Sequence, residues 1–228
     1  MNEHYPLAVA NFKENKTLEE TSQWLDELAE AHLDFSGTII ICPSFPFLAA
    51  TALKIRQLLE QSPNKRLNIK LGCQDISQFE QGAHTGEVAA TQISDIVSYT
   101  IIGHSERRRA LKENDEILAK KVTNAHAAGL EVVYCVQDEH TLIPQGVKIV
   151  AYEPPSAIGT GNPDTPENAQ RVAEIIKTKG KFIVIYGGSV SAENIASFLK
   201  EDIVDGVLVG GKSLNPQDFI PLVAASNY

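Results

Sequence analysis

The carboxylate of Glu153 lies between a short apolar run and a segment rich in proline and glycine. Residues 147–152 have the pattern of a β-strand, Pro154-Pro155 follows Glu153, and Gly159-Thr160-Gly161 comes next. Proline fixes φ, whereas glycine lets backbone N–H groups approach an anion closely. The arrangement suits a base at the edge of a gated site. A strand that ends in a turn with a solvated glutamate would show the same pattern.

Two other groups that could do chemistry also follow apolar runs. Lys13 could supply fixed positive charge to an anionic substrate or to charge that develops in a transition state. His104 stands out by position among six histidines, and a helix that began directly after it would favour the neutral ring. The alternatives are a surface lysine in a turn and, next to His104, a structural ion pair between Glu106 and Arg107.

Paired glycines follow the last two apolar runs of the chain. Gly187-Gly188-Ser189 follows one run and Gly210-Gly211-Lys212 follows the next. A single glycine pair indicates only a tight turn, but two pairs after consecutive strands, together with Gly159, predict a phosphate cradle. The sequence has no Cys-x-x-Cys, no His-x-x-x-His and no G-x-G-x-x-G after a strand, so we expect neither a metal site nor a bound nucleotide cofactor.

The composition is that of an ordinary globular protein with an acidic surface. The chain has 228 residues, of which 43% are hydrophobic and 21% charged, and its formal net charge is -9. That charge argues against nucleic acid as a partner. No charged-then-apolar leader opens the chain and no apolar run approaches ~20 residues, so we expect a cytoplasmic protein without a membrane partner. Cys42 and Cys73 are expected as buried free thiols, although a disulfide is conceivable.

Short apolar runs alternate with helical patterns from one end of the chain to the other. The expected strands are residues 7–10, 38–42, 68–72, 99–102, 131–135, 148–152, 182–186 and 206–209. The expected helices include 17–31 with a capping box of Thr17 and Glu20, 114–128, 165–179 and one that begins at Ser191. About eight strand–helix units without a break in composition predict one α/β domain over residues 1–228, a (β/α)8 barrel.

One unit of this barrel is too short. Only residues 137–145 lie between the fifth and sixth expected strands, and they contain Pro144. A crossover helix needs ten or more residues, so this helix is expected to be shortened or missing. An apolar flank left uncovered there is a reason to expect a partner subunit.

The motifs at the expected strand ends resemble those of the triosephosphate isomerase family. The matching strings, in the family's order, are AVANFKEN (8–15), GAHTGEV (82–88), YTIIGHSERRR (99–109), AYEPPSAIGTG (151–161), YGGSV (186–190) and GVLVGGKSL (206–214). GHSER, YEP with IGTG, and YGGS are together highly specific, and the strings extend over nearly the whole chain.

The resemblance implies the interconversion of dihydroxyacetone phosphate and glyceraldehyde 3-phosphate through an enediol(ate), in glycolysis and gluconeogenesis and without a cofactor. It implies Glu153 as the catalytic base, His104 as the imidazole that polarises the carbonyl, and Lys13 as the electrostatic stabiliser. It also implies substrate contacts from Asn11, Lys13, Gly159, Ser189, Gly210 and Gly211, and supporting roles for Ser105, Glu106 and Thr85. Residues 154–162 match a lid in the family, and Thr85 matches a residue that reaches the site of a neighbouring subunit.

Two alternatives to an active isomerase were weighed. A catalytically silent phosphate-binding scaffold would not need Lys13, His104 and Glu153 together, and an aldolase would need a Schiff-base lysine or a metal. The resemblance also implies a homo-oligomer, with a dimer favoured over a tetramer.

Overall fold

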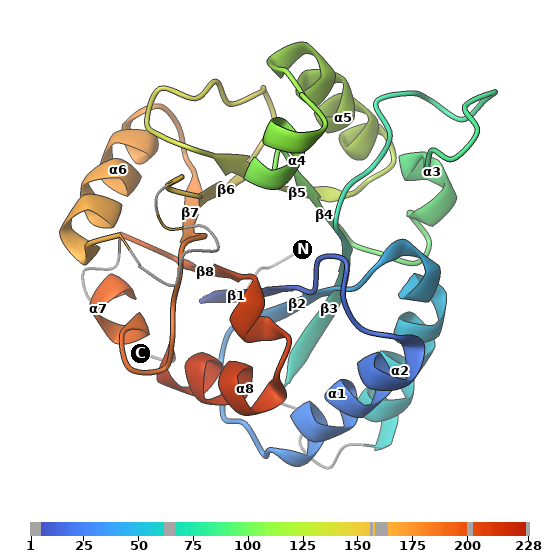
Figure 1. The fold of residues 1–228 in the computed structure, drawn as a ribbon, viewed down its shortest axis with the longest axis vertical. Helices are drawn as coiled ribbons and strands as arrows, with labels where there is room; N and C mark the ends of the chain where they lie inside the picture. Colours follow the sequence, from blue (N-terminus) through green and yellow to red (C-terminus); the bar gives the residue numbers. More distant parts are fainter. Residues whose placement is uncertain (1–5, 62–66, 156, 158–163, 200–202, 227–228) are drawn as a thin grey trace.

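The chain folds into a closed barrel of eight parallel strands in sequence order, surrounded by helices (Figure 1). The computed structural model describes residues 6–61, 67–155, 157, 164–199 and 203–226. The strands are β1 (Leu7–Asn11), β2 (Thr38–Cys42), β3 (Asn68–Cys73), β4 (Tyr99–Ile102), β5 (Glu131–Val136), β6 (Ile149–Tyr152), β7 (Ile183–Tyr186) and β8 (Gly206–Val209). All eight predicted strands and the predicted (β/α)8 barrel are confirmed.

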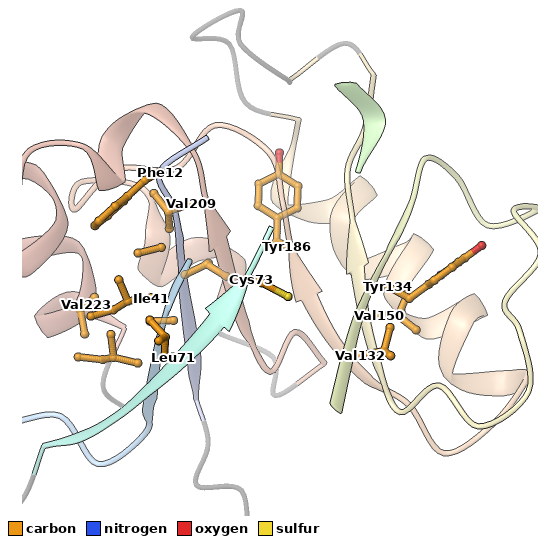
Figure 2. Close-up of a cluster of buried hydrophobic side chains, with 14 of the residues drawn as sticks. Phe12, Ile41, Leu71, Cys73, Val132, Tyr134, Val150, Tyr186, Val209 and Val223 are labelled. Carbon is orange, nitrogen blue, oxygen red and sulfur yellow. The ribbon is translucent and has the colours of Figure 1, made fainter. Parts of the chain in front are cut away.

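The strands are apolar on both faces because both faces are buried. In β1, Leu7 and Val9 belong to the small cluster inside the barrel, whereas Ala8 and Ala10 belong to the larger cluster between strands and helices. Alternate side chains of a strand point to opposite faces, so a barrel strand needs an unbroken apolar run. Figure 2 shows side chains of the larger cluster, with Phe12 on one side, Tyr134 on the other, and Tyr186 and Cys73 between them.

The helices begin where the sequence offers capping side chains. They are α1 (Leu18–Glu30), α2 (Leu48–Gln61), α3 (Ala90–Ile93), α4 (Ser105–Ala110), α5 (Asp115–Ala127), α6 (Pro166–Thr178), α7 (Ile195–Leu199) and α8 (Pro216–Ala225). Thr17 and Glu20 form the predicted capping box of α1, and Asn114 and Thr165 cap α5 and α6. Such caps satisfy backbone N–H groups that have no partner within the helix.

The connection between β5 and β6 contains no helix, as predicted. Residues 137–148 are all described, and they form bends and turns in which Asp138 accepts hydrogen bonds from the backbone N–H groups of His140 and Thr141. Leu142 in this connection has 67% of its surface exposed. The unit between β3 and β4 is also thin, because α3 has only four residues, and this was not anticipated.

Two further expectations concern the cysteines and membranes. Cys42, Cys73 and Cys135 are buried free thiols, so the possible Cys42–Cys73 disulfide is not formed. Burial raises the pKa of the Cys73 thiol to about 12, which keeps it in the unreactive protonated form. Within the described part of the chain, no helix is long and apolar enough to cross a membrane.

Candidate active site

A cavity of about 540 Å³ opens at the carboxyl ends of the barrel strands. Predicted site residues that line it are Asn11, Lys13, His104, Glu153, Ser189, Gly210 and Gly211. They follow β1, β4, β6, β7 and β8, so residues up to 200 positions apart in the chain meet because parallel strands of a barrel end at one face.

Lys13 is held in a strained backbone conformation at the end of β1. Its φ is +53°, in the left-handed region that costs energy for a residue other than glycine. The Asn11 side chain accepts a hydrogen bond from the Lys13 N–H at 3.0 Å, and the Ser44 hydroxyl and Gln74 amide donate to the Lys13 carbonyl at 3.1 and 2.8 Å. These bonds aim the ammonium group into the cavity, where it meets Glu106 Oε1 at 2.5 Å.

The imidazole of His104 is arranged to be neutral. His104 is the N-cap of α4, and its Nδ1 accepts a hydrogen bond from the backbone N–H of Glu106 at 3.2 Å. A nitrogen that accepts a hydrogen bond carries no proton, so the ring proton is assigned to Nε2. His104 Nε2 lies 3.0 Å from Glu153 Oε1, which makes it a donor directed into the cavity.

Glu153 is a buried carboxylate directly after β6. Only 1% of its side chain is exposed, and its Oε2 accepts a hydrogen bond from the Ser105 N–H at 2.9 Å. Burial raises the pKa of the Glu153 carboxyl, while His104, the Ser105 N–H and Lys13 oppose the rise. A carboxylate whose pKa lies above its ordinary value is a stronger base, and it retains the partners that stabilise its ionised form.

The glycine-rich turns after β7 and β8 form a further part of the cavity wall, next to Glu153 and Lys13. A Cβ at Gly187 would lie 2.8 Å from Glu153 Cγ, and one at Gly188 would lie 2.1 Å from the Tyr186 hydroxyl. Glycine is therefore required by space at these two positions. The Ser189 hydroxyl donates to the Ala157 carbonyl at 2.8 Å, which joins this turn to the segment after β6.

A clasp that the sequence did not reveal joins the ends of β6 and β7. The Tyr152 hydroxyl donates to Asp164 Oδ2 at 3.2 Å, and the Tyr186 hydroxyl accepts the Asp164 N–H at 3.0 Å. Burial raises the pKa of Tyr186 to about 12, so its hydroxyl stays neutral. Tyr152 directly precedes Glu153, and Tyr186 directly precedes Gly187. The two hydrogen bonds to Asp164 therefore connect the ends of β6 and β7 next to the cavity.

The supporting residues have different fates. Ser105 and Glu106 contact Glu153 and Lys13, as described above. The expected ion pair between Glu106 and Arg107 is wrong, because Arg107 instead binds Asp75 and Glu113 at 2.7 and 2.8 Å.

Of the described supporting residues, Ser105, Glu106 and Thr85 are not among those that line the cavity. Thr85 is exposed on the segment between β3 and α3, which reaches outward beyond the helices (Figure 1). Gly159 and most of the expected lid lie outside the described residues. Among the described residues, no three histidine, cysteine or acidic side chains form a group that could hold a metal ion.

The triosephosphate isomerase family model matches residues 6–226. The chain belongs to the triosephosphate isomerase family. Its relatives include the triosephosphate isomerase of Hahella chejuensis, 34% identical over 96% of this chain and 98% of the relative. The triosephosphate isomerase of Mesomycoplasma hyopneumoniae is 36% identical over 93% and 96% of the two chains. That of Aquifex aeolicus is 33% identical over 95% and 98%. The family match extends over the elements that form the cavity, including both glycine-rich turns.

Proposed function

We propose that this protein interconverts dihydroxyacetone phosphate and D-glyceraldehyde 3-phosphate, and that Glu153, His104 and Lys13 carry the reaction. The main support is the contact of a buried carboxylate with a neutral imidazole, in a cavity that two glycine-rich turns also line. Family membership supports the same reaction.

The chemistry is a proton transfer between adjacent carbons. Glu153 takes a proton from the carbon next to the carbonyl, the electron pair moves to the carbonyl oxygen, and an enediol(ate) forms. By way of His104, a proton then moves from the hydroxyl oxygen to the former carbonyl oxygen. The protonated Glu153 returns its proton to the carbon that carried the carbonyl, and the other carbon becomes the new carbonyl carbon. A base with a raised pKa suits this step, because its conjugate acid must form and then release the proton at one pH.

His104 would act on the oxygens of the substrate. Its Nε2–H points at Glu153 in the free protein, and a carbonyl oxygen that enters the cavity would replace the carboxylate as the acceptor. A fixed donor that faces developing negative charge stabilises the transition state more than the ground state. The Lys13 ammonium would add positive charge at the same end.

The phosphoryl group would lie in the turns after β7 and β8. Backbone N–H groups of Ser189, Gly210 and Gly211 are the proposed donors, with Gly159 as a further donor implied by the family resemblance. Glycines allow the close approach of the backbone, and a local nest of N–H groups outweighs a distant net charge of -9.

The assembly is proposed to be a homodimer, with a tetramer as the alternative. Phe79, 41% exposed, stacks on His84 in the outward segment that also carries Thr85. An exposed aromatic pair on a projecting segment is typical of an interface. Light scattering at micromolar concentration should give at least twice the chain mass, and a monomer would contradict both assemblies. We further propose a cytoplasmic location, where free triose phosphates would be the substrate.

A coupled assay with glyceraldehyde 3-phosphate tests the function. Dihydroxyacetone phosphate formed by the protein is reduced by a purified dehydrogenase, and the loss of NADH is followed. We expect turnover in the range of well-evolved enzymes and none after Glu153→Gln. Phosphate binding without turnover would instead support the silent scaffold.

A further inference from the structure

The cavity has one lysine whose role is unassigned. Among its described lining residues, the ammonium groups are those of Lys13 and Lys212. Lys13 contacts Glu106 at 2.5 Å, beside His104 at the reacting end of the cavity. Lys212 follows Gly211 directly in the turn after β8, where the phosphoryl group is proposed to bind.

In the free protein Lys212 is paired with an acid that also lines the cavity. Its Nζ lies 3.0 Å from Asp218 Oδ1, and the two side chains are 53% and 42% exposed. An ion pair with this exposure contributes little, because water screens it and two long side chains must be ordered. The pair can therefore open when a better partner arrives.

The positive charge of Lys212 also interacts with Glu193 in the segment after β7. The pKa of Glu193 is lowered, chiefly by the hydroxyl of Ser191 and in smaller part by Lys212. Ser191 itself lines the cavity. Lys212, Ser191 and Asp218 of α8 thus line the same cavity as the proposed phosphate-binding turns.

We propose that Lys212 is a phosphate-binding residue that exchanges Asp218 for the phosphoryl group of the substrate. The ligand class is a phosphate monoester dianion. This inference rests on the proposed function and assigns to the same site a charged contact in addition to the backbone N–H groups.

Charge explains why the exchange is favourable. A dianion in the cradle offers Lys212 two negative charges where Asp218 offers one, and charge-assisted contacts to phosphate are stronger than those between neutral groups. Backbone N–H groups alone discriminate only weakly between the monoanion and the dianion of a phosphate. An ammonium group favours the dianion over the monoanion and over uncharged trioses.

The test is Lys212→Met, with Lys120→Met as the matched control. Lys120 is also exposed and paired with an acid, but it lies on α5 outside the cavity lining. We expect Lys212→Met to raise KM about five- to tenfold with kcat within about twofold, as for the loss of one charged contact to a bound anion. Lys120→Met should leave both constants unchanged. A KM for Lys212→Met equal to that of the control would overturn the proposal.

Salt separates a direct contact from a distant field. At about 0.5 M salt, interactions beyond a few ångströms are screened, so a direct contact should keep at least a threefold difference in KM. A difference that disappears at this salt concentration would overturn the proposal.

Inorganic phosphate is a second probe that needs no turnover. Calorimetry should show weaker phosphate binding for Lys212→Met and tighter binding for Asp218→Asn, which frees Lys212. If Asp218→Asn tightens phosphate binding by the same factor when Lys212 has already been replaced by methionine, the exchange is contradicted. If the wild type lacks isomerase activity, the proposed function fails, while this binding measurement still decides the role of Lys212.

Discussion

Two neighbouring residues at the start of α4 direct their charges to opposite places. Glu106 binds Lys13 and lies beside His104, two residues that line the cavity. Arg107 points away and joins Asp75, Glu113 and Lys121, which we call the buried ion cluster. In the cluster, each charge has an opposite charge within 3 Å: Lys121 lies 2.6 Å from Asp75 and 2.7 Å from Glu113, and Arg107 lies 2.7 and 2.8 Å from them.

The cavity lacks this balance. Glu153 is at least as buried as Asp75, Glu113 and Lys121, yet it faces a neutral imidazole and one backbone N–H. In the buried ion cluster, two carboxylates face two cations, so its formal charges cancel. The cluster joins the segment after β3 to α4 and α5. Burial alone therefore does not mark a catalytic charge. A buried carboxylate that lines a cavity is available for chemistry, whereas one that is enclosed by ion-pair partners serves structure.

The largest expected effect is that of Glu153→Gln. Without the base, kcat should fall by about 10⁴-fold. Because the pKa of Glu153 is raised by burial, its ionised form costs folding energy, so the variant should be at least as stable as the wild type. Coupled assays measure kcat, and urea unfolding measures the free energy of unfolding. A variant that loses activity only because it unfolds would show that the charge of Glu153 serves structure.

Lys121→Met should do the reverse. It leaves Asp75 and Glu113 buried without a main counter-charge, which should reduce the free energy of unfolding by about 3 kcal/mol. In the fraction that stays folded, kcat should change less than tenfold. Urea unfolding measures the loss, and Lys120→Met, one residue earlier on the exposed face of α5, is the control that should be nearly silent.

His104→Gln should have a smaller effect than the loss of the base. The amide can still donate a hydrogen bond, but it cannot exchange a proton with the substrate oxygens. We expect kcat to fall by about 10²-fold with KM nearly unchanged, and steady-state kinetics measure both. A stability loss as large as that of Lys121→Met would place His104 with the structural charges and contradict the assignment.

A difference in pH dependence is the smallest effect. Burial raises the pKa of Asp75 from 3.8 to about 6, against the opposing effects of Lys121 and Arg107. The folded state then holds a proton that the unfolded state releases, so the contribution of Asp75 is lost as pH rises from about 4 to about 6. Relative to Asp75→Asn, the wild type should lose about 2 kcal/mol over this range. A pH-independent difference in unfolding free energy would show that Asp75 titrates normally.

Much of the fold could be predicted because its signals are local. Continuous apolar runs mark strands buried on both faces, and Thr17, Asn114 and Thr165 mark helix starts through hydrogen bonds within three residues. The missing helix after β5 followed from length alone. The short α3 did not, since residues 74–98 between β3 and β4 are enough for a helix of ordinary length.

The site was predictable where a group follows a strand directly. His104 and Glu153 are of this kind, and the barrel alone brings them to one face. The partners of Glu106 and Arg107 were not predictable, because adjacent helix residues point in different directions and their partners lie far away in sequence. The Asp164 clasp was missed for the same reason, since its tyrosines come from two different strands.

Steady-state kinetics of Glu153→Asp decide whether Glu153 is the catalytic base. Aspartate keeps the charge and withdraws the carboxylate by one methylene, so it changes the distance to the substrate carbon and little else. If Glu153 is the base, we expect kcat to fall by about 10²-fold or more while KM stays within about threefold of the wild-type value. A kcat equal to that of the wild type would show that Glu153 is not the base.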